Sequence, residues 1–209
     1  MNATRAAYLD AARVAVALSE SHDVRDRWDE PTVLPHLRVG ALVAHLARSV
    51  LQPASYLDTD AVTNTDGIDA VGHYRSFTNL RDPRSEANTS TVERAVAAAA
   101  AGHRAVVGAM PRALRSLEAR LEAFPEDRVV TTFGDLPMTL DEYLRTRCVE
   151  LSVHVDDLAR SVGRSDHVPE AAIRIAIDVV LDVAADRIGM IDVLRSLTGR
   201  TDSDVLRLF

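Results

Sequence analysis

The amino-acid sequence predicts an all-α fold, namely a four-helix bundle with a small β-hairpin and a helical C-terminal extension. Apolar residues recur at three- and four-residue spacing along most of the chain, which is the period of a helix with one buried face. Four long segments show this spacing, and the loops between them are long enough for a crossover connection. Two short apolar segments also flank Gly134 and Asp135, a pair typical of a tight two-residue hairpin loop.

The first two helices are expected at residues 4–19 and 38–51. Pro53 should end the second helix, because proline has no N–H for the helical hydrogen-bond ladder. The segment 29–36 contains two prolines and is expected to be a loop. The positions expected to be buried are Tyr8, Ala11, Ala12, Ala15 and Leu18 in the first helix, and Val39, Leu42, Val43, Leu46 and Val50 in the second.

The middle of the chain gives weaker patterns. Residues 58–67 are polar and are expected to be irregular, and a weaker helical pattern covers 68–77 before an exposed segment at 81–89. Ser90 and Glu93 have the spacing of a capping box. A long third helix is therefore expected to begin at Ser90 and to reach about Phe124, with a kink at Pro111.

The fourth helix has the clearest pattern in the chain. The hairpin strands are predicted at 128–133 and 136–138, and a second capping box, Thr139 with Glu142, begins the helix that follows. Gly163 should end that helix. Its buried stripe is expected to contain Leu144, Cys148, Leu151, Val155, Leu158 and Val162.

We expect residues 1–165 to form the bundle and residues 166–209 the helical extension. Pro169 begins a helix that Gly189 ends, and its apolar row should pack on the bundle or on the partner subunit of a homodimer. A short helix at 190–197 and a tail to Phe209 follow. The apolar row consists of Ile173, Ile177, Val180, Leu181, Ala184 and Ile188.

Composition excludes several classes of protein. The chain is 47% hydrophobic and 26% charged, and no apolar run is long enough to span a membrane, so we expect a cytoplasmic protein without a membrane partner. A formal net charge of -7 argues against a nucleic-acid partner. Cys148 is the only cysteine, which excludes an internal disulfide and any CxxC site. A metal would have to be held by His, Asp or Glu.

Three potential metal ligands lie at the edges of apolar stripes on two helices. Glu150 and His154 are one helical turn apart, and His45 stands in the same relation to the stripe of its own helix. The three side chains could therefore converge in the groove between those helices. The alternative interpretation is an exposed Glu–His pair together with a boundary histidine that is hydrogen-bonded to a loop.

Around these residues the sequence resembles the actinobacterial mycothiol-dependent maleylpyruvate isomerase N-terminal domains, within the wider DinB-like group of bundles. The resemblance covers roughly the first 165 residues. It implies a DinB-like four-helix bundle in which His45, Glu150 and His154 bind a divalent metal, usually Zn²⁺, and it implies mycothiol as a thiol partner. The matching segments are LRVGALVAHLARS around His45, FGDLPMTLDEYLRTRCVELSVHVDDLARSVG around Glu150 and His154, and LRSLTGR near Leu197.

Such a ligand set suits the activation of a thiol. Two imidazoles and one carboxylate leave at least one coordination position open, and a metal-bound thiol loses its proton near neutral pH. Because Cys148 lies in an apolar stripe, the reacting sulfur is expected to belong to a small-molecule thiol. The predicted function is a metal-dependent enzyme that transfers this thiol to a small electrophile or isomerises that electrophile.

Three further residues are candidates for the reaction. Arg48 and Arg147 flank the ligands at three-residue spacing and could hold a substrate carboxylate, or could pair with neighbouring surface acids. Asp157 could orient a ligand or bind substrate, although the pattern favours a solvated helix acid. No role is assigned to the remaining histidines, which are His22, His36, His73, His103 and His167.

Two other functions stay open. The first is a non-catalytic metal- or ligand-binding bundle protein, because the isomerase that the sequence resembles has a larger second domain than the residues after 165 could form. The second is a helix-turn-helix regulator, which is disfavoured because the few arginines of the C-terminal helices are interspersed with several aspartates.

Overall fold

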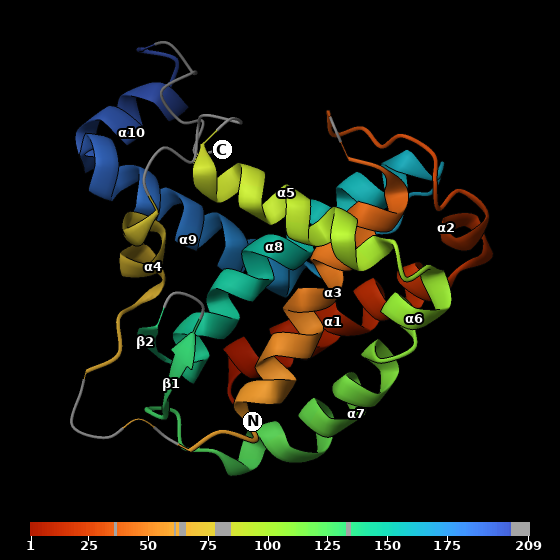
Figure 1. Ribbon diagram of the computed structural model, residues 1–209. Coiled ribbons are helices and arrows are strands. Elements are labelled where there is room, and N and C mark those ends of the chain that lie inside the picture. Colours follow the sequence, from red (N-terminus) through yellow and green to blue (C-terminus); the bar gives the residue numbers. More distant parts are fainter. Residues whose placement is uncertain (36, 61, 63–65, 78–84, 133–134, 202–209) are drawn as a thin grey trace.

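The computed structural model describes residues 1–35, 37–60, 62, 66–77, 85–132 and 135–201 (Figure 1). In this part of the chain the fold is an all-α bundle with a two-stranded antiparallel sheet, as the sequence predicts. None of the described helices is long and apolar enough to cross a membrane.

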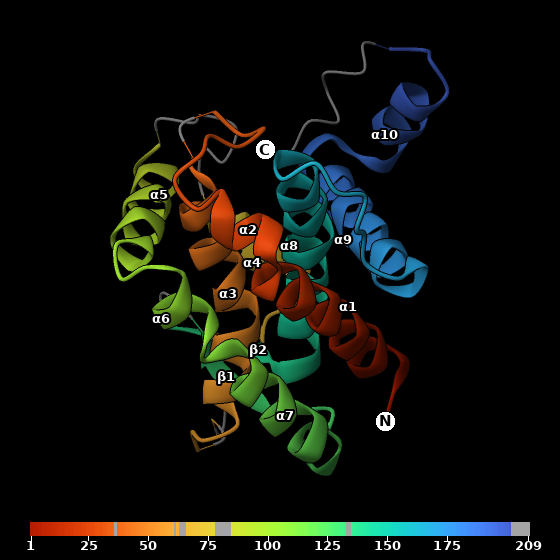
Figure 2. The ribbon, with the colours of Figure 1, turned by 90° about the vertical axis from the view of Figure 1, so that its right-hand side faces the viewer.

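The bundle is built from four helices that pack on one another (Figures 1 and 2). Every residue predicted for the buried faces of its first, second and fourth helices is buried. A short helix, α2 (His22–Asp26), follows the first bundle helix and was not predicted. The bundle helices are α1 (Ala3–Glu20), α3 (Val39–Tyr56), α7 (Met110–Arg120) and α8 (Leu140–Ser161).

Helix α3 continues through Pro53 to Tyr56, so the prediction that Pro53 ends it is wrong. Pro53 has no N–H to donate to the carbonyl of Ser49, four residues earlier. The hydroxyl of Tyr8 on α1 donates to that buried carbonyl instead, with an oxygen–oxygen distance of 2.9 Å. The neighbouring helix thus supplies the hydrogen bond that the proline removes.

The third helix is divided, which corrects the prediction of one long helix with a kink at Pro111. Ser85, not Ser90, is the N-cap of its first part, since the Ser85 side chain accepts a hydrogen bond from the backbone of Asn88. The chain then breaks at Gly102, whose φ of 83° lies in the region that favours glycine, and Pro111 lies in the first turn of α7. The parts are α5 (Glu86–Ala99), α6 (His103–Val107), α7 and the 3-10 turn η1 (Leu121–Ala123).

A shorter helix, α4 (Ala70–Ser76), lies within the weaker predicted segment 68–77, and Asp69 is its N-cap. The described residues of 58–67 belong to no helix and no strand, as expected. The segment 81–89, expected to be exposed, lies partly outside the described residues, and α5 begins within it.

The hairpin pairs β1 (Val129–Thr132) with β2 (Leu136–Thr139). Thr132 pairs with Leu136, and Gly134 of the predicted two-residue loop lies outside the described residues. Thr139 caps α8 as predicted, because its side chain accepts a hydrogen bond from the backbone N–H of Glu142. The Glu142 carboxylate accepts from the backbone N–H of Ala70, which ties α4 to the start of α8.

Two helices follow the bundle. Helix α9 (Glu170–Ile188) packs on α8, α1 and α4, and α10 (Met190–Leu197) follows it, whereas most of the predicted tail lies outside the described residues. The buried face of α9 differs from the predicted row, of which only Ala184 is fully buried and Ile177 is 52% exposed. The side chains that α9 buries are those of alanine and valine, whereas the isoleucines and the leucine of the predicted row are half-buried or exposed. The buried residues are Ala172, Ala176, Val179, Val183 and Ala184.

We predict that Tyr8→Phe lowers the free energy of unfolding by about 1–2 kcal/mol, because it leaves the buried Ser49 carbonyl without its donor. The loss should be smaller in a Pro53→Ala background, where residue 53 regains an N–H that the helix directs at Ser49. Chemical denaturation of the four proteins in this cycle measures the coupling. An equal loss in both backgrounds would contradict this role of Tyr8.

Candidate metal centre

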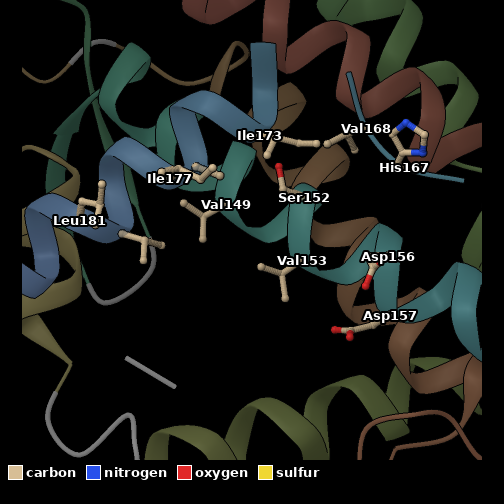
Figure 3. A pocket seen from close by; sticks show the side chains of 12 residues that line it. Val149, Ser152, Val153, Asp156, Asp157, His167, Val168, Ile173, Ile177 and Leu181 are labelled. Carbon is tan, nitrogen blue, oxygen red and sulfur yellow. The ribbon is translucent and has the colours of Figure 1, made fainter. Parts of the chain in front are cut away.

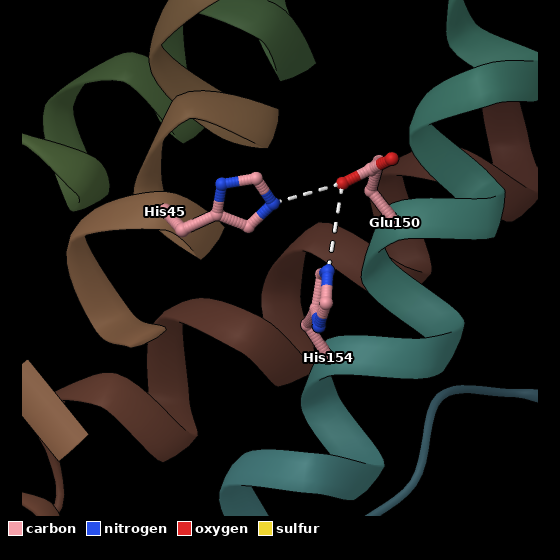
Figure 4. Close-up of side chains that lie close together, drawn as sticks. All are labelled: His45, Glu150 and His154. Carbon is pink, nitrogen blue, oxygen red and sulfur yellow. Dashed lines mark hydrogen bonds and ion pairs between the residues drawn. The ribbon is translucent and has the colours of Figure 1, made fainter. Parts of the chain in front are cut away.

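Three side chains from two helices meet in the groove between α3 and α8. His45 projects from the middle of α3, and Glu150 and His154 project from successive turns of α8 toward it (Figure 4). The buried stripes of both helices fix how each helix is rotated about its axis. Residues at the edges of those stripes therefore face one another across the groove.

Both imidazoles point at one carboxylate oxygen. Nε2 of His45 lies 3.0 Å from Oε2 of Glu150, and Nε2 of His154 lies 3.7 Å from the same atom. The two rings are perpendicular, with centroids 4.8 Å apart. Each of the three side chains is about one-fifth exposed, so Glu150 and His154 are not an exposed surface pair.

The arrangement fits a divalent metal. Donor atoms around a tetrahedral zinc with bonds of about 2.0–2.1 Å lie roughly 3.3 Å from one another. Here each residue offers one ligand atom, and these atoms all lie within 4.8 Å of one another. Across the residues that the structure describes, this is the only group of three or more His, Cys, Asp or Glu side chains placed closely enough to hold an ion.

A buried carboxylate orients His154. Oδ2 of Asp157 lies 3.1 Å from Nδ1 of His154, and Asp157 is only 8% exposed. The interpretation of Asp157 as a solvated helix acid is therefore wrong. Burial disfavours the imidazolium, but the hydrogen bond to Asp157 and the charge of Glu150 outweigh it and raise the pKa of His154. A proton on Nδ1, donated to Asp157, leaves the lone pair of Nε2 facing Glu150.

Glu150 is ionised at neutral pH. Burial alone would raise its pKa, but the hydrogen bond from His45 and the positive charge of Arg147 hold the pKa of this carboxyl well below its usual range. An anionic oxygen is thus fixed between two imidazoles, where it would bind a cation.

Positive side chains gather around this anion. The Arg147 guanidinium carbon lies 4.7 Å from the centroid of the Tyr143 ring, and its Nε donates to the hydroxyl of Thr146. Burial opposes its charge, yet Tyr143 and Glu150 hold the pKa of Arg147 above its usual value. Burial lowers the pKa of Arg48, and the nearby charges of Arg94 and Arg147 lower it further. Both predicted arginines therefore lie near the three potential ligands.

His73, to which the sequence analysis assigned no role, lies where the charges of Arg147 and Glu150 act on it. His73 on α4 is 6% exposed, and burial together with the charge of Arg147 lowers its pKa to about 4. It is therefore neutral at physiological pH. Its helix has only a weak apolar pattern, and no local signal indicates that α4 packs beside α8. His36 lies outside the described residues.

A family model described as the mycothiol maleylpyruvate isomerase N-terminal domain matches residues 8–159, a range that contains His45, Glu150 and His154. No curated protein and no solved structure shows a significant match to the chain.

We predict that Asp157→Asn lowers the pKa of His154 in metal-free protein, because it removes a charge that favours the imidazolium. A proton NMR titration of the histidine rings measures this value, with exposed His22 as an internal control. Because folding raises the pKa of His154, protonation of this imidazole stabilises the fold. The stabilisation is fully present below about pH 6.5 and is lost as the pH rises through the pKa of His154 in the folded protein.

The loss of stability caused by Asp157→Asn should accordingly be larger near pH 6 than near pH 9. A His154 pKa that is the same in both proteins would contradict the orienting contact.

Proposed function

The chain belongs to the mycothiol maleylpyruvate isomerase N-terminal domain family, and on this premise we propose that it is a metal-dependent enzyme that activates mycothiol. The thiol would be transferred to a small electrophilic substrate, or would assist the isomerisation of that substrate. The observation that carries the proposal is the convergence of His45 and His154 on the carboxylate of Glu150. The family description supplies the identity of the thiol.

In this proposal His45 and His154 hold a divalent cation, Zn²⁺, through their Nε2 atoms, and Glu150 holds it through its carboxylate. When bound, such a cation lowers the pKa of a thiol that joins it, and so supplies a thiolate nucleophile. The donor set supports this assignment, because two imidazoles and a carboxylate suit zinc and leave a position open.

The other residues around the centre would orient and bind. The Asp157 carboxylate would accept a hydrogen bond from the Nδ1–H of His154 and so keep the Nε2 lone pair directed at the groove. The charges of Arg48 and Arg147 would bind a carboxylate or another anionic group of the electrophile beside Glu150.

The burial of Cys148 supports an external source of sulfur. Its side chain is fully buried in the core stripe of α8, and burial raises the pKa of the thiol to about 12. A thiol with this pKa is protonated at neutral pH and is a poor nucleophile. The reacting sulfur would therefore come from mycothiol.

We predict that His45→Ala and His154→Ala each weaken zinc binding by at least about 100-fold, since each removes one of three ligands. His22→Ala, which changes an exposed histidine on α2, should bind zinc as the unaltered protein does. Metal content after purification without an affinity tag or added metal, followed by competition titration, measures both effects. Stoichiometric zinc in His154→Ala would refute this ligand set.

We also predict that Cys148→Ser keeps thiol-dependent turnover while His154→Ala loses it, because the sulfur is external and the metal is required. The assay uses zinc-loaded protein, mycothiol and a panel of small electrophiles. Activity that disappears in Cys148→Ser but survives in His154→Ala would reverse the assignment. Zinc binding without any binding of mycothiol would favour the alternative, a non-catalytic metal- or ligand-binding protein.

A further inference from the structure

A pocket lies between α8 and α9 (Figure 3). Its volume is about 490 Å³, within the range of sites for small molecules. Its walls are apolar, and two carboxylates lie at one end. The wall residues include Val149 and Val153 from α8 and Ile173, Ile177 and Leu181 from α9, and the carboxylates are those of Asp156 and Asp157.

The pocket and the metal centre both use side chains of α8. Val149 and Val153 directly precede Glu150 and His154 on α8, so pocket and centre occupy adjacent strips of one helix surface. Asp157 belongs to both, because it lines the pocket and also binds Nδ1 of His154. A molecule in the pocket would therefore lie one hydrogen bond away from a proposed metal ligand.

The chemistry of the walls selects the occupant. No arginine or lysine lines the pocket, and its one imidazole, that of His167, is outnumbered by the carboxylates of Asp156 and Asp157, which disfavour an anion. Val153 is 47% exposed and Ile177 is 52% exposed, so an apolar molecule would cover accessible hydrophobic surface. The arginines lie instead near Glu150, where an anionic group would be bound.

We propose that the α8–α9 pocket binds the uncharged, apolar body of the electrophile, an aryl or branched alkyl group. The proposal rests on the proposed function, since it places that group beside the centre where the thiol would react. The size of the pocket and its link to His154 through Asp157 favour a small molecule over a second copy of the chain.

The test uses the neutral fluorophore N-phenyl-1-naphthylamine as a probe of the pocket. Val153→Asp and Ile177→Asp put a charge at half-exposed wall positions, and Leu194→Asp on α10 is the matched control, because Leu194 is 55% exposed and does not line the pocket. We expect both wall variants to bind the probe at least about tenfold more weakly and the control to bind it normally. Circular dichroism verifies that all three variants are folded.

A second measurement separates the pocket from the metal chemistry. In the Co²⁺-loaded protein, the probe should change the visible absorption of the metal through Asp157 and His154, and Ile177→Asp should abolish this change. Failure to bind Co²⁺ would overturn the proposed function. The fluorescence titration would still measure whether the probe binds in the pocket, because it does not depend on the metal.

Two results would contradict the proposal that the α8–α9 pocket binds an apolar group. The first is probe binding that is unchanged in both wall variants. The second is an unaltered protein that binds no probe but sediments as a dimer that Ile177→Asp dissociates, which would assign this face to a second copy of the chain.

Discussion

The contact between the Glu150 carboxylate and the imidazole of His45 depends on how α3 and α8 are rotated about their axes. Successive residues of a helix are about 100° apart, so a register change of one residue in either helix would turn the histidines away from the carboxylate. The rotation is set by the apolar stripes that both helices bury against α1 and each other. The core of the bundle thus positions the polar site, and the contact of α3 with α8 is the one on which the proposed chemistry depends.

Charge is distributed unevenly around this contact. Glu150 lies among the two imidazoles and Arg147, and these neighbours keep it ionised in spite of its burial. On the adjacent strip of α8 the surface becomes apolar, with Asp156 and Asp157 at its far end. A substrate with an anionic group near the arginines and an apolar body along α9 would match both surfaces. Its reactive carbon would then lie near Glu150 and His154, where the proposed thiol would attack.

The features that the sequence predicts well are those with a local cause. Apolar spacing places the buried faces of α1, α3 and α8, and Thr139 begins α8 through a bond to its own first turn. The errors have distant causes. Helix α3 passes Pro53 because Tyr8 of another helix satisfies the freed carbonyl. The face that α9 buries depends on its packing against α8, α1 and α4, and the burial of Asp157 depends on the surrounding packing. The weak α4 gave no indication that His73 lies near Glu150.

The central claim is that this centre holds a metal that accepts sulfur from an external thiol. X-ray absorption spectroscopy of the zinc-loaded protein, with and without mycothiol, tests it most directly. Without the thiol, the account predicts two imidazole neighbours of the metal and no sulfur. With the thiol, it predicts one added sulfur neighbour, both in the unaltered protein and in Cys148→Ser. A spectrum that gains no sulfur when mycothiol is added, or that contains sulfur before it is added, would contradict the account.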